Sequence, residues 1–578
     1  MPEREPVGDL PEEPIEKQAA PAEGSHPAPT TQPEPPVIEE PPAPVLSAVL
    51  DRAHLGDIEG ALGTIHVEDV ARRRTLRQHL LTLAAIIGPG LIVMVGDNDA
   101  GGVSTYAQAG QDYGYSLLWT LLFLLPVLIV NQEMVVRLGA VTGVGHARLI
   151  NERFGRFWGF LSVGDLFLLN FLTIMTEFIG ISLSAAYFGI SPVIIVPLSA
   201  ALLIMITTTG NFRRWERAMF VFLAANLLVF PLAILSHPKP GAALHGFLVP
   251  GIAGGLSSSA VLLIIAIVGT TVAPWQLFFQ QSNVVDKRIT PRWLAYERAD
   301  TVIGAFVVII GATAIMMATA AAFGGTKDYG TFTDALGTAV GLAHHVGRLV
   351  GVVFALLLFD ASIVGASAVT LATSYAFGDV FGLRHSLHRS FREARVFYGS
   401  YTGLVVLAAA IVLIPNAPLG LITTAVQALA GILLPSATVF LVLLCNDREV
   451  LGPWVNSAWL NAVASVIVGV LLMLSLILVI STIFPAIDVP TLLVVLSGLL
   501  ILALAGGGVW VWRGRRQAAP RPAIDRQARE RWRMPPLALL NRPTWSPARR
   551  AAMFTLRAYL VVAVLLLVVK AVELAVRR

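Results

Sequence analysis

Two short polar interruptions of long apolar runs are the parts of this sequence best suited to chemistry. The first, GDNDAGG at residues 96–102, places Asp97 and Asp99 with an amide and three glycines in a run that otherwise suits lipid. The second, GTTVAPW at residues 269–275, interrupts another such run. Carboxylates inside a membrane are costly, and Gly and Pro are poor helix formers. We therefore expect both helices to unwind here and expose backbone carbonyls, which with the carboxylates can bind a cation.

The overall composition indicates a polytopic membrane protein. Of the 578 residues, 55% are hydrophobic and 13% are charged, and the mean hydropathy is +0.72. The single cysteine, Cys445, excludes a disulfide framework within one chain and a cysteine-based metal cluster, so oxygen or nitrogen must hold any metal. Basic and aromatic residues do not form the interleaved pattern typical of nucleic-acid binding. The lipid bilayer and a small ion are the partners we expect.

Apolar runs of about 20 residues, long enough to cross a bilayer, recur from residue 80 to the end. Arg and Lys gather in alternate loops, such as ARRRTLRQ, NFRRWER, DKRITPRW and RHSLHRSFREAR. The positive-inside rule then places the amino terminus and the 513–550 segment in the cytoplasm, and we expect a prokaryotic cell membrane. The predicted spans are 80–110, 116–141, 157–182, 192–209, 217–235, 257–283, 299–322, 347–377, 397–414, 417–444, 458–484 and 489–512, with a thirteenth near 552–574.

The two interrupted spans are the first and the sixth, which occupy corresponding places in two successive sets of five. Because five is odd, the two sets have opposite orientations, as in an inverted repeat with a binding site between two broken helices. A packing glycine or a proline kink would explain either interruption alone. The joint pattern predicts an all-α fold of five plus five helices, with two or three further spans at the carboxyl end.

The segments outside this core differ in composition. Residues 1–46 are rich in Pro and Glu and predict a disordered acidic cytoplasmic tail, and residues 47–79 contain apolar residues at helical spacing that predict an amphipathic helix, followed by basic residues. The transporter core is expected at 80–512 and a basic cytoplasmic segment at 513–551. Residues 552–578 are a candidate additional transmembrane helix.

Several motifs resemble the Nramp family of divalent-metal transporters, whose fold is a LeuT-like inverted repeat. GPGLIVMVGDNDAGGVSTYAQAGQDYGYSLLW is similar to the first-helix signature of the family, and RLGAVTG closes the second span as it does there. GTTVAPWQLFFQQS resembles the sixth-helix pattern, and QALAGILLPSATVFLVLLCNDREVLG resembles the tenth span. The resemblance covers about residues 80–480 and implies a metal ion as cargo, with no cofactor.

The resemblance also implies a metal site, residue by residue. Some residues of this implied site supply an oxygen, and the others stand where the family has a different ligand. Asp99 falls on the metal-binding aspartate, Gly96 and Thr270 on positions with ion-facing carbonyls, Gln427 on a glutamine of the tenth span, Gly102 on an asparagine, Ala273 on a methionine and Trp275 on a histidine.

The three replacements, Gly102, Ala273 and Trp275, all favour a hard, hydrated cation that moves without protons. A methionine sulfur favours transition metals, and Ala273 lacks it. Gly102 removes an oxygen ligand and widens the site, which suits Mg²⁺ because this ion dehydrates reluctantly. Trp275 cannot exchange protons as an imidazole does. These changes resemble the Nramp-related magnesium transporters, and they imply uptake of Mg²⁺ and Mn²⁺ that is not coupled to protons.

Other polar residues in the spans have two interpretations each. Asp97 either joins the ion site or is satisfied by half-helix N-termini or neighbouring helices. Glu177 matches an acidic position of the family's proton path, but its companion acid is missing, which favours a structural or cavity-lining role. Glu133 is expected to pair with Arg137 at i, i+4. Asp360 fits a solvated pathway and a hydrogen-bonded structural role equally well.

Three rival functions remain at this point. A proton-coupled Mn²⁺ or Fe²⁺ transporter is the nearest, and Ala273 and Trp275 argue against it. A transporter of small organic solutes would share the fold, and a membrane sensor or scaffold would bind metal without moving it. An enzyme is not expected, because the spans contain neither a His-Glu metal-ligand spacing nor a serine elbow.

Overall fold

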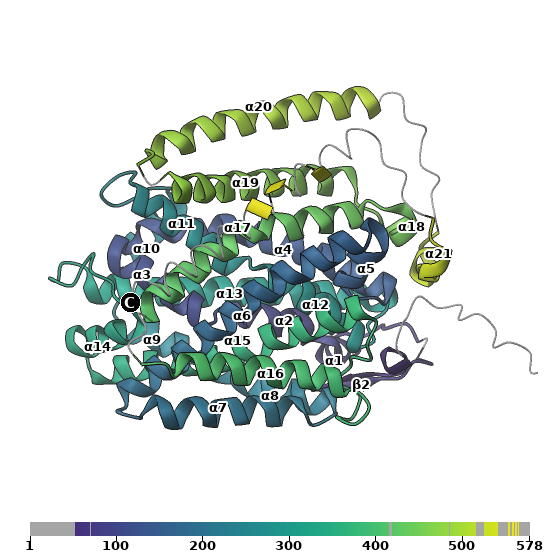
Figure 1. Cartoon of the computed structure of the whole chain (residues 1–578), viewed down its shortest axis with the longest axis horizontal. Coiled ribbons are helices and arrows are strands. Elements are labelled where there is room, and N and C mark those ends of the chain that lie inside the picture. The colour runs from purple at the N-terminus through teal and green to yellow at the C-terminus, as the bar shows by residue number, and fades with distance from the viewer. Residues whose placement is uncertain are drawn as a thin grey trace, which may run out of the picture. The chain divides into compact units, whose positions relative to one another are not determined.

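The apolar runs fold as helices, because a chain in lipid must satisfy its backbone hydrogen bonds within itself. Each of the twelve spans predicted before residue 513 contains helix in the computed structural model (Figure 1). The predicted tail at 1–46, the predicted helix at 552–574 and much of the basic segment lie outside the described residues. The structure describes residues 52–69, 71–415, 419–484, 486–515, 525–541, 553–554, 558–559, 561–562 and 565.

The helices follow the predicted order of two sets of five. The first set comprises α1 (Leu76–Ile86), α2 (Pro89–Val95), α3 (Ala100–Tyr113), α4 (Leu118–Thr142), α6 (Arg156–Tyr187), α7 (Pro192–Thr207), α8 (Phe212–Ala225) and α9 (Val229–Leu235). The second comprises α11 (Ser258–Thr271), α12 (Pro274–Asp286), α13 (Leu294–Phe323), α15 (Arg348–Phe381), α16 (Arg395–Val412) and α17 (Leu419–Cys445), and α19 (Ala458–Ile483) and α20 (Val489–Arg515) follow it.

Shorter elements precede, connect or follow these helices. They are the helices α5 (His146–Phe154), α10 (Pro240–Leu248), α14 (Ala335–His345), α18 (Arg448–Leu451) and α21 (Arg526–Arg531), the 3₁₀ turns η1 (Arg52–His54), η2 (Gly114–Leu117), η3 (Asn226–Leu228), η4 (Pro291–Trp293), η5 (Gly452–Trp454) and η6 (Leu537–Leu539), and the strands β1 (Ile58–Gly60) and β2 (Gly63–Ile65).

Ten described helices are long and apolar enough to cross a membrane, with residues 100–142 counted as one helix. The pair α1 and α2, bent by 56° at its break, makes an eleventh, and α7 is a shorter apolar helix. This count agrees with the predicted polytopic fold. The protein is therefore an integral membrane protein built from helices.

Both predicted interruptions are real breaks. The helix α2 ends at Val95, and α3 begins at Ala100 with Asp99 as its N-cap, because an aspartate oxygen can accept from the free N–H groups of a first turn. In the other span α11 ends at Thr271, and α12 begins with Pro274, which lacks the N–H that a helix interior needs.

The two sets pack against each other through their long helices. The helix α6 lies along α15 and also contacts α17, and α13 contacts α2, α3 and α4. Figure 1 shows α19 and α20 side by side at one edge of the bundle, and these two helices also contact each other. The broken helices α2–α3 and α11–α12 are thus enclosed by α4, α6, α13, α15 and α17.

The predicted amphipathic helix before the core is replaced by a β-hairpin. Strands β1 and β2 pair antiparallel, with Ile58 opposite Ile65 and Gly60 opposite Gly63. The isoleucines face the core and are 4% exposed. Glycine weakens a helix, and two glycines flanking a two-residue turn suit a hairpin. The helix prediction was wrong because it gave the spacing of the apolar residues more weight than the two glycines.

Candidate metal site

The two breaks are joined by side-chain hydrogen bonds. Asp97, in the first break, accepts a hydrogen bond from the amide of Gln276, in the first turn of α12. The side-chain oxygen Oε1 of Gln276 accepts a hydrogen bond from the side-chain amide of Gln132 of α4 at 3.0 Å. On the other side, the Tyr106 hydroxyl of α3 lies 2.8 Å from the hydroxyl of Thr271 at the end of α11. The breaks therefore form one polar region.

Asp99 lies at the centre of this region with Glu177. Its Oδ1 accepts from the Gly102 N–H at 2.7 Å, which caps α3, and its side chain lies beside that of Glu177 of α6. Glu177 Oε2 accepts from the Ala100 N–H at 3.0 Å. Asp99 is 3% exposed and Glu177 is 0% exposed. Two buried carboxyl groups in contact repel each other when both are ionised, so a cation or a shared proton is needed between them.

Glycines let the surrounding helices approach these carboxylates. A Cβ at Gly365 of α15 would lie 2.7 Å from Glu177 Oε2 and 2.8 Å from Asp99 Cβ. A Cβ at Gly101 would lie 1.6 Å from the Gln427 amide nitrogen, so α17 also reaches the start of α3. Real Cβ atoms essentially never come this close, so a larger residue at either position would force the neighbouring side chains to shift.

Several polar atoms in this region have no hydrogen-bond partner. They are Asp97 Oδ2, Thr270 Oγ1, Gln427 Nε2 and Glu177 Oε1. Buried polar atoms are normally paired, so these atoms are available to bind water or an ion. Within the described residues, no group of three or more His, Cys, Asp and Glu side chains could hold a metal ion. A metal here would therefore depend on few carboxylates together with amides, carbonyls and water.

The structure brings most of the residues predicted for this site into the region of the two breaks. Gly96 is the C-cap of α2, and a Cβ there would be 3.4 Å from the Trp275 ring. Gly102 lies in the first turn of α3, where a Cβ would be 2.7 Å from the Asp97 carbonyl oxygen. Ala273 is the N-cap of α12 and is 5% exposed. Thr270 precedes the break in the last turn of α11.

Three residues of the region were not assigned to it from the sequence. Gln276 and Gln132 look like ordinary amides between helices, and Glu177 was expected to be a structural or cavity-lining acid. Gln276 could have been assigned to the region from the sequence, because it lies in the first turn after the second break. Gln132 and Glu177 could be assigned only from contacts between helices that are distant in the sequence.

Two other membrane acids lie apart from this region. Glu133 hydrogen-bonds Arg137, as predicted, and also pairs with Arg298 of α13 at 2.5 Å. Asp360 of α15 is 5% exposed, and neither of its carboxylate oxygens has a hydrogen-bond partner within 3.5 Å. Asp360 therefore remains a candidate for both the solvated-pathway role and the structural role.

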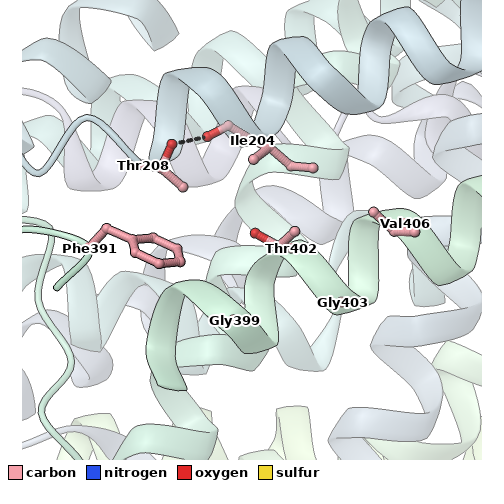
Figure 2. Close-up of a pocket in the computed structure, with 7 residues that line it drawn as sticks. All are labelled: Ile204, Thr208, Phe391, Gly399, Thr402, Gly403 and Val406. Carbon is pink, nitrogen blue, oxygen red and sulfur yellow. Dashed lines mark hydrogen bonds between the residues drawn. The ribbon is translucent and has the colours of Figure 1, made fainter. Parts of the chain in front are cut away.

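A surface pocket elsewhere contains no charged side chain. Figure 2 shows this pocket, of about 620 Å³, between α7 and α16. It is formed by Ile204, Thr208, Phe391, Gly399, Thr402, Gly403 and Val406. A Cβ at Gly399 would meet no atom within 4 Å, unlike one at Gly365.

These two glycines provide a matched test of the site. We expect Gly365→Ala to reduce divalent-metal uptake by about tenfold, because the added methyl group must displace Glu177 or Asp99. Gly399→Ala should transport normally, since its methyl group enters open space. Uptake by proteoliposomes loaded with a metal-sensitive dye measures both. Equal rates for the two variants would show that the carboxylate pair takes no part in transport.

Comparisons with known proteins agree with this architecture. Residues 90–481 match the family described as Nramp, natural resistance-associated macrophage protein-like. The divalent metal cation transporter MntH of Lacticaseibacillus casei is 28% identical over 420 residues, which cover 69% of this chain and 90% of that protein. MntH of Staphylococcus aureus is 25% identical over 424 residues, with coverage of 69% and 91%. A crystal structure of an Eremococcus coleocola manganese transporter has a TM-score of 0.56 at 20% identity and covers 78% of this chain and 99% of that one.

Proposed function

This chain belongs to the Nramp family of divalent-metal transporters, and we propose that it carries Mg²⁺, and also Mn²⁺, inward across the cell membrane without coupled protons. The proposed ion site lies between the two breaks, with Asp99 as its principal charge. Gly96 and Thr270 would supply carbonyl oxygens, and Gln427 and Asp97 would bind the ion or its water. Trp275 would line the site without binding.

The observation that carries this proposal is the chemistry of the second break. Ala273 and Pro274 form the turn, and the Trp275 ring packs toward Gly96 and against Phe279, with ring centroids 6.0 Å apart. Neither a sulfur nor an imidazole is present in this turn. Mg²⁺ prefers oxygen ligands and retains several waters, so a site of few carboxylates and unpaired amides suits it better than a soft site would.

The membrane potential can supply the driving force. A divalent ion moving to a negative interior gains roughly 4.6 kcal/mol per 100 mV, which is twice the value for a single charge. Uptake against a modest concentration gradient therefore needs no proton.

Flux measurements with Ala273→Met test the proposed ion. We expect the wild type to take up both Mg²⁺ and Mn²⁺ without acidifying the lumen, and Ala273→Met to shift the preference toward Mn²⁺ by about tenfold through its sulfur. The exposed Ala503→Met, on α20, is the matched control. Metal-sensitive and pH-sensitive dyes in proteoliposomes at a clamped potential provide the readout. Strong Mn²⁺ uptake with no Mg²⁺ flux and an acidified lumen would contradict the proposal.

A proton-coupled Mn²⁺ or Fe²⁺ transporter is the second candidate, and the contact between Asp99 and Glu177 favours it. A proton shared by these carboxyl groups would be released when a cation binds Asp99, which is a route to coupling. The acidification measurement separates the two candidates. A sensor or scaffold would bind metal and show no flux above that of empty liposomes.

A further inference from the structure

The β-hairpin before α1 is fastened to the core by side chains from several helices. The Ala61 N–H donates to Glu216 of α8, and the Ala61 carbonyl accepts from Arg217 Nε at 3.0 Å. Ile58 and Ile65 belong to the buried hydrophobic core, and both strands contact α1. A Cβ at Gly60 would lie 2.0 Å from the Ala85 carbonyl oxygen of α1, so the two backbones touch.

Arg288, just after the end of α12, binds the backbone of the segment that leads into the hairpin. Its Nε donates to the Ala53 carbonyl at 2.9 Å, and its Nη1 donates to the Asp57 carbonyl at 3.0 Å. The backbone φ of Arg288 is 65°, which is uncommon for a residue other than glycine. This residue ends α12 in the left-handed conformation of a helix C-terminal cap, in which the Arg288 N–H donates to the Val285 carbonyl and the Ile289 N–H to the Val284 carbonyl. The cap fixes the point from which the Arg288 side chain reaches the segment before the hairpin.

The 3₁₀ turn η1 makes a third attachment. His54 Nε2 lies 3.5 Å from Asp286 Oδ1 at the end of α12 and 3.2 Å from the His385 carbonyl oxygen. His385 lies in the loop between α15 and α16. At the other end of the hairpin, the Val67 N–H donates to Asp57 and the His66 ring hydrogen-bonds to it. Both bonds lower the pKa of this half-buried carboxyl, which therefore stays ionised near neutral pH.

Residues 52–66 therefore join elements of both five-helix sets at the predicted cytoplasmic face. The elements are α1 and α8 of the first set, and the end of α12 with the loop after α15 of the second. In inverted-repeat transporters, access alternates when one group of helices moves against the other. A segment bound to both groups restrains that motion.

We propose that residues 52–66 form a cytoplasmic latch, which closes the inner side of the transporter and must loosen before the ion is released. The latch stabilises the inward-closed conformation by its contacts with α1, α8 and α12. Weakening it shifts the population toward the inward-open state, and the apparent affinity for external ion falls in proportion. The inference rests on the chain being a transporter and not on which ion it carries.

The test uses the full chain with a reporter cysteine on the half-helix. The single native cysteine is replaced by Cys445→Ser, and Val93→Cys, at a position 0% exposed in α2, reports displacement of that helix. The double substitution Arg217→Ala/Arg288→Ala opens the latch. It removes hydrogen bonds to the backbone of residues 52–66 and one long contact with Glu59, and it retains the pair of Glu216 and Lys287.

We expect the opened latch to raise the rate of maleimide modification at Val93→Cys by at least about fivefold and to raise the apparent KM for external Mn²⁺ by a similar factor. The matched control is Arg148→Ala, which removes an ion pair with Glu152 within the single helix α5 and should change neither value. If the double variant does not yield folded protein, Ile58→Ser opens the latch by a separate contact. Unchanged maleimide reactivity in a folded variant would overturn the proposal whichever ion is transported, whereas loss of Mg²⁺ selectivity alone would not affect it.

Discussion

Replacing Asp99 with asparagine is expected to reduce Mg²⁺ and Mn²⁺ uptake into proteoliposomes by about 100-fold or more, which corresponds to about 2.7 kcal/mol of lost ion stabilisation. The substitution keeps the shape of the side chain and removes the principal negative charge of the proposed site. Magnesium sites in proteins usually depend on one or two carboxylates, so losing one affects binding strongly.

The fold should survive this change. Asparagine accepts a hydrogen bond at an N-cap as well as aspartate does, so the bond from the Gly102 N–H to this position can persist. Asp488→Asn is a matched control, because Asp488 accepts from the Thr491 N–H, also three residues on, at 2.9 Å on the exposed start of α20. Normal uptake by Asp99→Asn, measured with the same dyes, would exclude this residue from the ion site.

Replacing Lys287 with methionine should destabilise the protein by about 3–5 kcal/mol, the usual cost of removing one partner from a buried ion pair. Lys287 Nζ donates to Glu216 at 2.6 Å and to the carbonyls of Ile86 and Ile87 at 2.7 and 2.9 Å. Both charged side chains are 0% exposed. The ammonium group uses three donors, and its loss leaves the buried Glu216 carboxylate without its cation and takes one donor from each of the two carbonyls.

Thermal unfolding of the detergent-solubilised protein, followed by size-exclusion chromatography, measures this effect as a lower Tm. Lys239→Met removes an exposed lysine and should leave the Tm unchanged. The double variant Lys287→Met/Glu216→Met removes both charges and should recover part of the loss, because no ionised group is then left buried alone. Equal Tm values for Lys287→Met and Lys239→Met would show that the pair does not stabilise the fold.

Local chemistry in the sequence was sufficient to predict the two breaks. Asp99 precedes a run of small residues and can cap a helix, and Pro274 cannot lie in a helix interior. The apolar runs likewise predicted the membrane helices, because lipid leaves helix as the available backbone structure for such a chain. The resemblance of these motifs to the Nramp family agrees with the family match.

The same local reasoning failed where a neighbour outside the element decides the structure. Residues 58–65 contain apolar residues at helical spacing, yet they form a hairpin, because α1 and α8 offer a surface that fits two short strands. Glu177 lies far from Asp99 in the chain, and only the packing of α6 against α3 and α15 brings the two carboxyl groups together.

The sequence by itself determined where the membrane helices break and which ligand types each break offers, since both follow from residues adjacent in the chain. Only the tertiary structure decided that Asp97 contacts Gln276, that Asp99 contacts Glu177, and that a hairpin ties α1 to the end of α12. These contacts join residues on different helices. Their partners depend on how closely glycines such as Gly365 let the helices approach, and this packing cannot be derived from the pattern of any single segment.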